Sequence, residues 1–140
     1  MSKVNVRITS EAIVNLNAEK VWKKLVDFGG TEKFVPELIE KVIVEGNGIG
    51  AVRTIYLKGG GEIIEELTSI NSNNLEMKFI ILSTPMPVFN YEGVFTVFSQ
   101  EENKCNVRFK SIYEVSGEKK EEINNIIKNF QLTFLSNLDK

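Results

Sequence analysis

The feature that most constrains the fold is a series of six alternating segments in the middle of the chain. In one of them the sequence LEMKFII, starting at residue 75, alternates apolar and charged side chains with the period of a half-buried strand. The six segments are residues 41–45, 51–58, 62–70, 75–82, 91–99 and 105–114. The Gly-, Asn- and Glu-rich stretches between them are short hairpin loops, so neighbouring strands are expected to pair antiparallel.

A strand and two short helices are expected before this series. Residues 4–15 begin with apolar residues at every second position and read as a first strand. Asn17 can cap a helix whose apolar face carries Val21 and Leu25. Thr31 is expected to cap a second short turn, which ends before Pro36 because proline disfavours a helical residue in front of it.

A long amphipathic helix is expected at the end of the chain. After Ser116 and Gly117, apolar residues recur at steps of three and four as Ile123, Ile126, Ile127, Phe130, Phe134 and Leu138. The element order predicts an α+β fold in which helices cover one face of a seven-stranded antiparallel sheet. Residues 1–140 are expected to form a single domain.

Composition excludes several classes of function. The chain has no histidine, which removes Ser-His-Asp and Cys-His catalysis and every His-containing metal motif, and no cofactor motif is found. With 17 basic and 19 acidic residues and no basic run, nucleic-acid binding is not expected. Apolar runs are too short for stable membrane insertion. Cys105 is alone and no signal peptide is seen, which fits a cytoplasmic location.

The glycine-rich stretch GNGIG, residues 46–50, resembles part of a phosphate-binding loop. A dinucleotide fingerprint requires a strand before the glycines and a helix after them. Here the strand-forming sequence AVRTIYL follows, so no helix N-terminus is available to bind phosphate. The stretch is therefore interpreted as a hairpin turn.

Four blocks of the sequence resemble one known superfamily. In chain order they are VWKKLVDFGGTEKFVPELIEKV, GNGIGAVRTIYL, GGEIIEELTSIN and TPMPVFNYEGVFTV. Together they are similar to the polyketide cyclase/dehydrase and lipid-transport branch of the START and birch-pollen-allergen (SRPBCC) superfamily. The resemblance covers nearly the whole chain and implies a helix-grip fold, in which a curved sheet wraps around the long C-terminal helix and encloses an apolar cavity.

The resemblance also implies where that cavity opens. In the related abscisic-acid receptors a gating loop corresponds to residues 58–61 and a latch to residues 84–88. Here Gly59, Gly60 and Gly61 replace the apolar gate tip, so a hormone-sensor gate is not expected. These glycines are either a flexible hairpin tip or a mobile lid at the cavity mouth. The Pro85–Pro87 segment is either a plain turn or part of the portal. Many relatives carry tryptophan where this chain has Phe34.

Three polar residues are candidates for chemistry at the cavity. The two-residue period places Arg53 on the inner face of its strand and Glu65 on that of the next strand, where the two can pair. The pair is either a structural salt bridge or a polar anchor for a ligand. Tyr91 could orient a ligand or find a local partner. Gly93 marks a bulge or leaves room for ligand.

Apolar residues from the sheet and the last helix complete the expected lining. The residues expected to bind ligand are Phe34, Ile55, Leu57, Ile63, Glu65, Phe79, Ile81, Met86, Pro87, Tyr91, Gly93, Ile127, Phe130 and Phe134. In the strand at 105–114, alternation favours Val107, Phe109 and Tyr113 inside, whereas the receptor relatives suggest the opposite face.

Three functions follow as hypotheses. The leading one is binding or transport of a small hydrophobic molecule, such as a lipid or polyketide, by a monomer or homodimer. The second is a cyclase/dehydrase-like enzyme in which Glu65, Tyr91 and Arg53 are the catalytic candidates and no metal takes part. The third is a co-chaperone that binds a protein partner through an exposed apolar patch.

Overall fold

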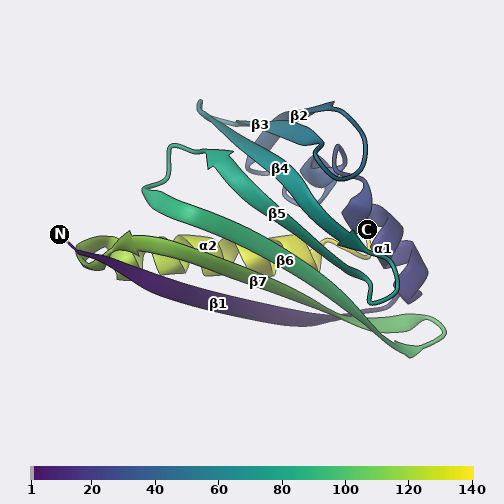
Figure 1. The fold of residues 1–140 in the computed structure, drawn as a ribbon. Coiled ribbons are helices and arrows are strands. Elements are labelled where there is room, and N and C mark those ends of the chain that lie inside the picture. The colour runs from purple at the N-terminus through teal and green to yellow at the C-terminus, as the bar shows by residue number, and fades with distance from the viewer. Residues whose placement is uncertain (1) are drawn as a thin grey trace.

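The computed structural model describes residues 2–140 as one curved antiparallel sheet closed by a long helix (Figure 1). The strands are β1 (Lys3–Val14), β2 (Ile39–Glu45), β3 (Val52–Leu57), β4 (Glu62–Asn71), β5 (Glu76–Ser83), β6 (Val88–Glu101) and β7 (Lys104–Ser116). The helices are α1 (Ala18–Val26) and α2 (Lys120–Ser136), with 3₁₀ turns at Thr31–Lys33 and Gly117–Lys119.

The sheet has seven strands in the order β1-β7-β6-β5-β4-β3-β2. Every neighbouring pair is antiparallel. Strand β1 forms one edge of the sheet and pairs with β7 along its whole length. Helix α2 packs on β1 and β7, while α1 and the first 3₁₀ turn connect β1 to β2 (Figure 1). The predicted α+β helix-grip fold, with two short helices after the first strand, is confirmed.

Local sequence explains the first helix but not the turn that follows it. The Asn17 side chain caps α1 as expected, because its Oδ1 accepts a hydrogen bond from the Glu19 amide at 2.9 Å. Thr31 does not cap the 3₁₀ turn, so that expectation was wrong. Its hydroxyl donates to the Phe28 carbonyl at 3.3 Å and accepts from Arg53, an inward residue of β3. A distant contact therefore outweighs the local capping preference.

Strand β6 begins earlier than the alternation predicts. Val88 and Phe89 pair with Val115 and Glu114 of β7, which extends the strand into the predicted latch loop. Asn90 then adopts a φ of 53°, and regular pairing resumes at Glu92. On its other side β6 pairs with β5 only as far as Glu92, opposite Ile80. The two strands therefore separate toward this end of the sheet.

The inner face of β7 is the one that alternation favours. Val107, Phe109 and Tyr113 are each at most 1% exposed and point toward α2. Ser111 lies on the same face and is fully buried. The alignment with receptor relatives suggested the opposite face, and that alternative was wrong.

The GNGIG stretch is a turn between β2 and β3. Gly46, Gly48 and Gly50 have φ values of 89°, 66° and 94°, a region that glycine enters without steric cost. Strand β3 follows directly, so no helix begins there. The hairpin interpretation is confirmed. Within residues 2–140, no helix combines the length and apolar composition needed to cross a membrane.

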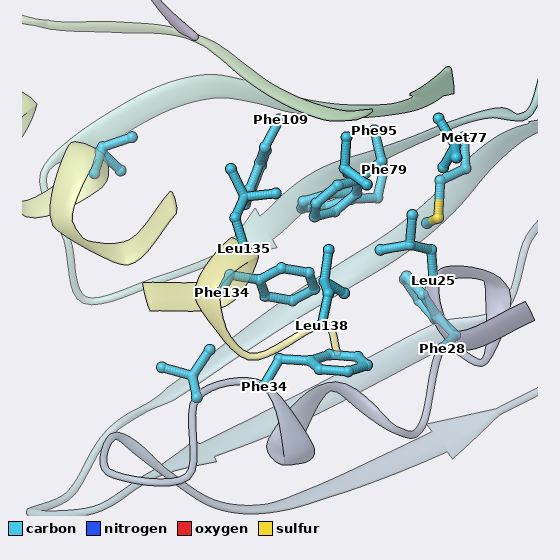
Figure 2. Close-up of a cluster of buried hydrophobic side chains, with 14 of the residues drawn as sticks. Leu25, Phe28, Phe34, Met77, Phe79, Phe95, Phe109, Phe134, Leu135 and Leu138 are labelled. Atoms are coloured by element: carbon cyan, nitrogen blue, oxygen red, sulfur yellow. The ribbon is translucent and has the colours of Figure 1, made fainter. Parts of the chain in front are cut away.

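Aromatic side chains fill the space between the sheet and the C-terminal end of α2 (Figure 2). The ring centroids of Phe95 and Phe109 are 4.1 Å apart, and Phe134 of α2 lies 4.9 Å from both Phe95 and Phe34. We call Phe34, Phe79, Phe95, Phe109 and Phe134 the aromatic cluster. Such close tilted rings stabilise a packed core beyond their burial alone.

Candidate functional site

A cavity of about 290 Å³ lies between the sheet and the middle of α2. Its wall comes from β3, β4, β5, β6, α2 and three connecting segments, and most of it is apolar. The lining residues are Leu38, Leu57, Lys58, Gly59, Gly60, Ile63, Glu65, Ile81, Pro85, Met86, Tyr91, Ile126, Ile127 and Phe130. We call this space the open cavity.

The β3–β4 hairpin and the β5–β6 loop both line the open cavity, and we call the part between them and α2 its mouth. Both loops lie at the end of the sheet opposite α1 (Figure 1). Gly59 and Gly60 form the hairpin tip with φ values of 89° and 103°. Leu38 and Ile126 flank the mouth and are 50% and 47% exposed. The mouth therefore presents apolar side chains to solvent.

Deeper between the sheet and α2 the space is nearly filled. Only about 40 Å³ remains where the rings of Phe79, Phe95, Phe109 and Phe134 come together. Arg53 and Thr31 also border this remnant. Between the sheet and α2, the aromatic cluster therefore leaves ligand-sized space only in the open cavity.

Arg53 and Glu65 form a buried ion pair, as the two-residue period predicts. They face each other across β3 and β4, and Arg53 Nε and Nη2 lie 2.7 and 2.6 Å from Glu65 Oε1. The two residues are only 5% and 6% exposed. Burying either charge alone would be costly, so the pairing is what allows both to be inside.

Arg53 is also fully engaged on its other side. Its Nη1 donates to the Phe28 carbonyl at 3.2 Å and to the Thr31 hydroxyl at 2.5 Å, and its guanidinium lies 3.8 Å from the centre of the Phe28 ring. These contacts tie the segment after α1 to the sheet. Arg53 does not line the open cavity, so its visible role is to hold Glu65 and this connection.

Glu65 keeps one oxygen for the cavity. Both contacts with Arg53 use Oε1, and none of the hydrogen bonds among the described side chains and backbone groups reaches Oε2. In this part of the chain, Ser116 Oγ is the one fully buried side-chain oxygen or nitrogen without a partner, so Oε2 must touch open space. Since Glu65 lines the open cavity, Oε2 can accept a hydrogen bond there.

Tyr91 lines the same cavity from β6. Its hydroxyl lies 2.7 Å from the Ser111 hydroxyl of β7, and its ring stacks on Tyr113 with centroids 6.0 Å apart. Burial raises the pKa of Tyr91 well above its ordinary value, with a smaller opposing effect from the Ser111 hydrogen bond. Tyr91 therefore stays protonated at neutral pH and is suited to hydrogen bonding rather than to proton abstraction.

Gly93 makes room for a ring of the protein. It pairs with Phe79 of β5, and a Cβ at this position would overlap the Phe79 ring. The missing side chain thus lets Phe79 lie flat on β6. Gly93 borders neither the open cavity nor the remnant.

The predicted lining residues separate into three groups. The open cavity includes Leu57, Ile63, Glu65, Ile81, Met86, Tyr91, Ile127 and Phe130. Ile55, Phe79 and Phe134 border only the filled remnant. Phe34, Pro87 and Gly93 border neither space, and Phe34 instead packs on Phe134.

Leu38, Lys58, Pro85 and Ile126 line the cavity but were not among the residues predicted to bind ligand. Ile126 carried a signal, because it belongs to the apolar series of the last helix. Lys58 and Pro85 belong to the loops that correspond to the gate and latch of the receptors, for which a place at the cavity mouth was one of two alternatives. Leu38 follows Pro36 in an irregular segment, where no periodicity predicts the direction of a side chain.

A curved antiparallel sheet gripping a C-terminal helix around an apolar cavity defines a helix-grip fold suited to hydrophobic ligands. The chain belongs to the polyketide cyclase/dehydrase and lipid transport family, whose model matches residues 5–140. No curated protein is a significant match.

Several solved structures share the fold. Norcoclaurine synthase from Thalictrum flavum, in complex with dopamine and hydroxybenzaldehyde, aligns with a TM-score of 0.81 and 18% identity over 99% of this chain and 86% of its own. The Zhui aromatase/cyclase from Streptomyces sp. R1128 gives 0.84 and 14% over 96% and 92%. The protein XoxI from Bacillus cereus gives 0.85 and 23% over 96% and 93%. At these identities the likeness concerns the fold.

Proposed function

We propose that this protein binds and carries a small hydrophobic molecule in the open cavity. The observation that carries the proposal is the cavity itself, about 290 Å³ of space with largely apolar walls. Glu65 and Tyr91 supply polar groups on its inner wall. A few oriented polar groups within an apolar wall are the usual composition of a small-molecule site.

The size of the cavity points to a compact ligand. Ligand pockets commonly span about 300–1,000 Å³, so a cavity of about 290 Å³ lies at the lower end. A single-ring or short-chain molecule fits this space better than a lipid with two long chains. The complex of norcoclaurine synthase with dopamine and hydroxybenzaldehyde shows that the same fold can hold single-ring compounds, which supports the proposed size class.

Native mass spectrometry of the gently purified protein, with analysis of its organic extract, tests the proposal. Calorimetry with single-ring aromatics and short fatty acids then measures binding directly. Ile63→Trp should abolish binding because it fills the cavity. Ile43→Trp is the matched control, since Ile43 is 46% exposed on β2, the edge strand of the same sheet. No bound molecule, no binding across the panel, or equal binding by the two variants would each contradict the proposal.

A second candidate is a cyclase/dehydrase-like activity on such a ligand. It is favoured by the free Oε2 of Glu65 at the cavity wall and by the fold shared with an aromatase/cyclase. In this alternative Glu65 accepts a proton from the bound substrate while Arg53 fixes its other oxygen. Once a substrate is known, Glu65→Gln should lower turnover more than binding. Unchanged turnover would remove Glu65 from the mechanism.

A further inference from the structure

Four buried polar side chains form a chain of hydrogen bonds from β1 across α2 and β7 to β6. They are Ser10, Gln131, Ser111 and Tyr91, which are 3%, 0%, 0% and 6% exposed. Ser10 Oγ donates to Gln131 Oε1 at 2.7 Å, and Gln131 Nε2 lies 2.9 Å from Ser111 Oγ. Ser111 Oγ in turn lies 2.7 Å from Tyr91 Oη. The chain ends at the wall of the open cavity.

The direction of these hydrogen bonds is fixed at Gln131. Its Nε2 lies 3.0 Å from the backbone carbonyl of Ile8, and a carbonyl oxygen can only accept. The amide nitrogen must therefore face Ile8, and Oε1 must face Ser10. The two protons on Nε2 are then both used, one by Ile8 and one by Ser111 Oγ.

Ser111 transmits this direction to Tyr91. Because Gln131 donates to it, the Ser111 hydroxyl must place its own proton elsewhere, and Gln131 Nε2 has no acceptor to offer. Ser111 is fully buried, and Tyr91 Oη is the one remaining partner that the described residues provide. Ser111 therefore donates to Tyr91. The phenolic proton of Tyr91 then has no acceptor among the described side chains and backbone groups, and a ligand in the open cavity, which Tyr91 lines, can supply one.

We propose that Gln131, acting through Ser111, fixes Tyr91 as a hydrogen-bond donor into the open cavity, so that the cavity selects ligands with an acceptor oxygen such as a ketone. The proposal rests on the carrier function above and specifies its ligand class. Gln131 is a positioning residue, because it touches Ser111 and not the cavity. A ligand without an acceptor at this point would leave the Tyr91 proton unpaired, which lowers affinity.

Acetophenone and α-methylstyrene test the selection, because they are nearly isosteric and differ by an oxygen in place of a CH₂ group. Calorimetry should show that the wild-type protein binds acetophenone ~10-fold more tightly, the size expected for one hydrogen bond to a buried donor. Tyr91→Phe should reduce this ratio to about one. Tyr56→Phe on the outer face of β3 is the control and should keep the wild-type ratio.

Gln131→Glu tests the direction itself. A buried glutamate is protonated, so it would donate its single proton to Ile8 and accept from Ser111. Ser111 would then accept from Tyr91, which leaves Tyr91 without a free proton. The preference for acetophenone should disappear although the fold and Tyr91 are retained. A general loosening of the structure would instead weaken both probes equally and keep their ratio.

The outcomes separate this inference from the carrier function. If both probes bind the wild-type protein equally, or if Gln131→Glu folds and keeps the preference, the inference is overturned while the carrier function stands. If neither probe binds, the carrier function fails for single-ring ligands and the inference fails with it. Should Gln131→Glu not fold, Ser111→Ala replaces it, because removing the link should at least halve the ratio.

Discussion

The two ends of the space between the sheet and α2 have opposite contents. At the end near α1, the aromatic cluster leaves a void of only about 40 Å³. At the other end, smaller side chains and glycines around the β3–β4 hairpin leave about 290 Å³. The same sheet and the same helix form both ends. Side-chain volume, and not backbone architecture, therefore determines where this fold can hold a ligand.

The boundary between the two ends carries two polar residues beside the apolar Leu57, Ile63 and Phe130. Glu65 and Tyr91 border both the open cavity and the filled remnant, and each is anchored by a buried partner, Arg53 or Ser111. These anchors place hydrogen-bonding atoms at the inner limit of the open cavity. The aromatic end is packed core, and under the proposed function the polar groups at the boundary would orient the ligand in the open end.

Among the variants considered, Phe134→Ala should most strongly reduce the difference between the filled aromatic end and the open cavity. Phe134 contacts four rings of the protein, from Phe34, Phe95, Phe109 and Phe130, and is 5% exposed. Its loss should cost about 4 kcal/mol in the free energy of unfolding, measured by urea denaturation.

The same substitution should also join the two spaces, so that ligands with two rings bind. Phe98→Ala, at a 39% exposed phenylalanine, should cost well under about 1 kcal/mol. Similar losses for both variants would show that the cluster is not the stabilising end.

Arg53→Met should have the next largest effect, because it leaves Glu65 buried without its cation. We expect a loss of about 3 kcal/mol in the free energy of unfolding. The double variant Arg53→Met/Glu65→Met should recover most of that loss, since a packed apolar pair can replace a buried ion pair. A double variant as unstable as the single one would mean that the contacts of Arg53 with Phe28 and Thr31 dominate.

Gly93→Ala tests how tightly the Phe79 ring packs over residue 93. The added methyl group would overlap the Phe79 ring, and overpacking of this kind costs about 1–3 kcal/mol. We expect a loss of about 2 kcal/mol by urea denaturation. Adding Phe79→Leu should restore part of the stability because it frees the space over residue 93. An absence of any loss in Gly93→Ala would show that the ring moves freely.

The smallest predicted effect is a dependence of stability on alkaline pH. Burial raises the pKa of Tyr113 from 10.0 to about 12, and it raises the pKa of Tyr91 further. Because the unfolded chain releases these protons at lower pH than the folded one, the contribution of the two hydroxyls to stability should be constant below about pH 10 and fall as pH rises toward 12. Urea midpoints should therefore decline less steeply in Tyr113→Phe than in the wild type. Equal slopes would contradict the burial of this hydroxyl.

Much of the fold follows from periodicity, whereas the contents of the cavity do not. Alternation placed Arg53 and Glu65 on inner faces, and their pairing needed no further information. The contact between Thr31 and Arg53 joins residues 22 positions apart and overrides a local capping signal. The hydrogen bonds of Gln131 could not be predicted either, because its partner Ser10 is 121 residues away in the chain. A polar residue on the apolar face of the last helix was the available hint.

The division into a filled and an open end could not be predicted from the sequence. Phe79, Phe134 and Ile81 all lie on inner faces, yet only Ile81 borders the open cavity. The difference depends on how the large rings pack against each other and on the space that Gly93 gives to Phe79. Both are consequences of packing in three dimensions, which residue spacing does not report.

The most direct test of the account is a methyl NMR titration of the wild-type protein with acetophenone. We predict that shifts concentrate on the methyl groups of the open end, those of Ile63, Ile81, Met86 and Ile127. Methyl signals of Met77, Leu135 and Leu138, in the core around the aromatic cluster, should stay in place (Figure 2). Shifts centred on Met77, Leu135 and Leu138, or none at saturating ligand, would contradict the claim that the open end is the binding site.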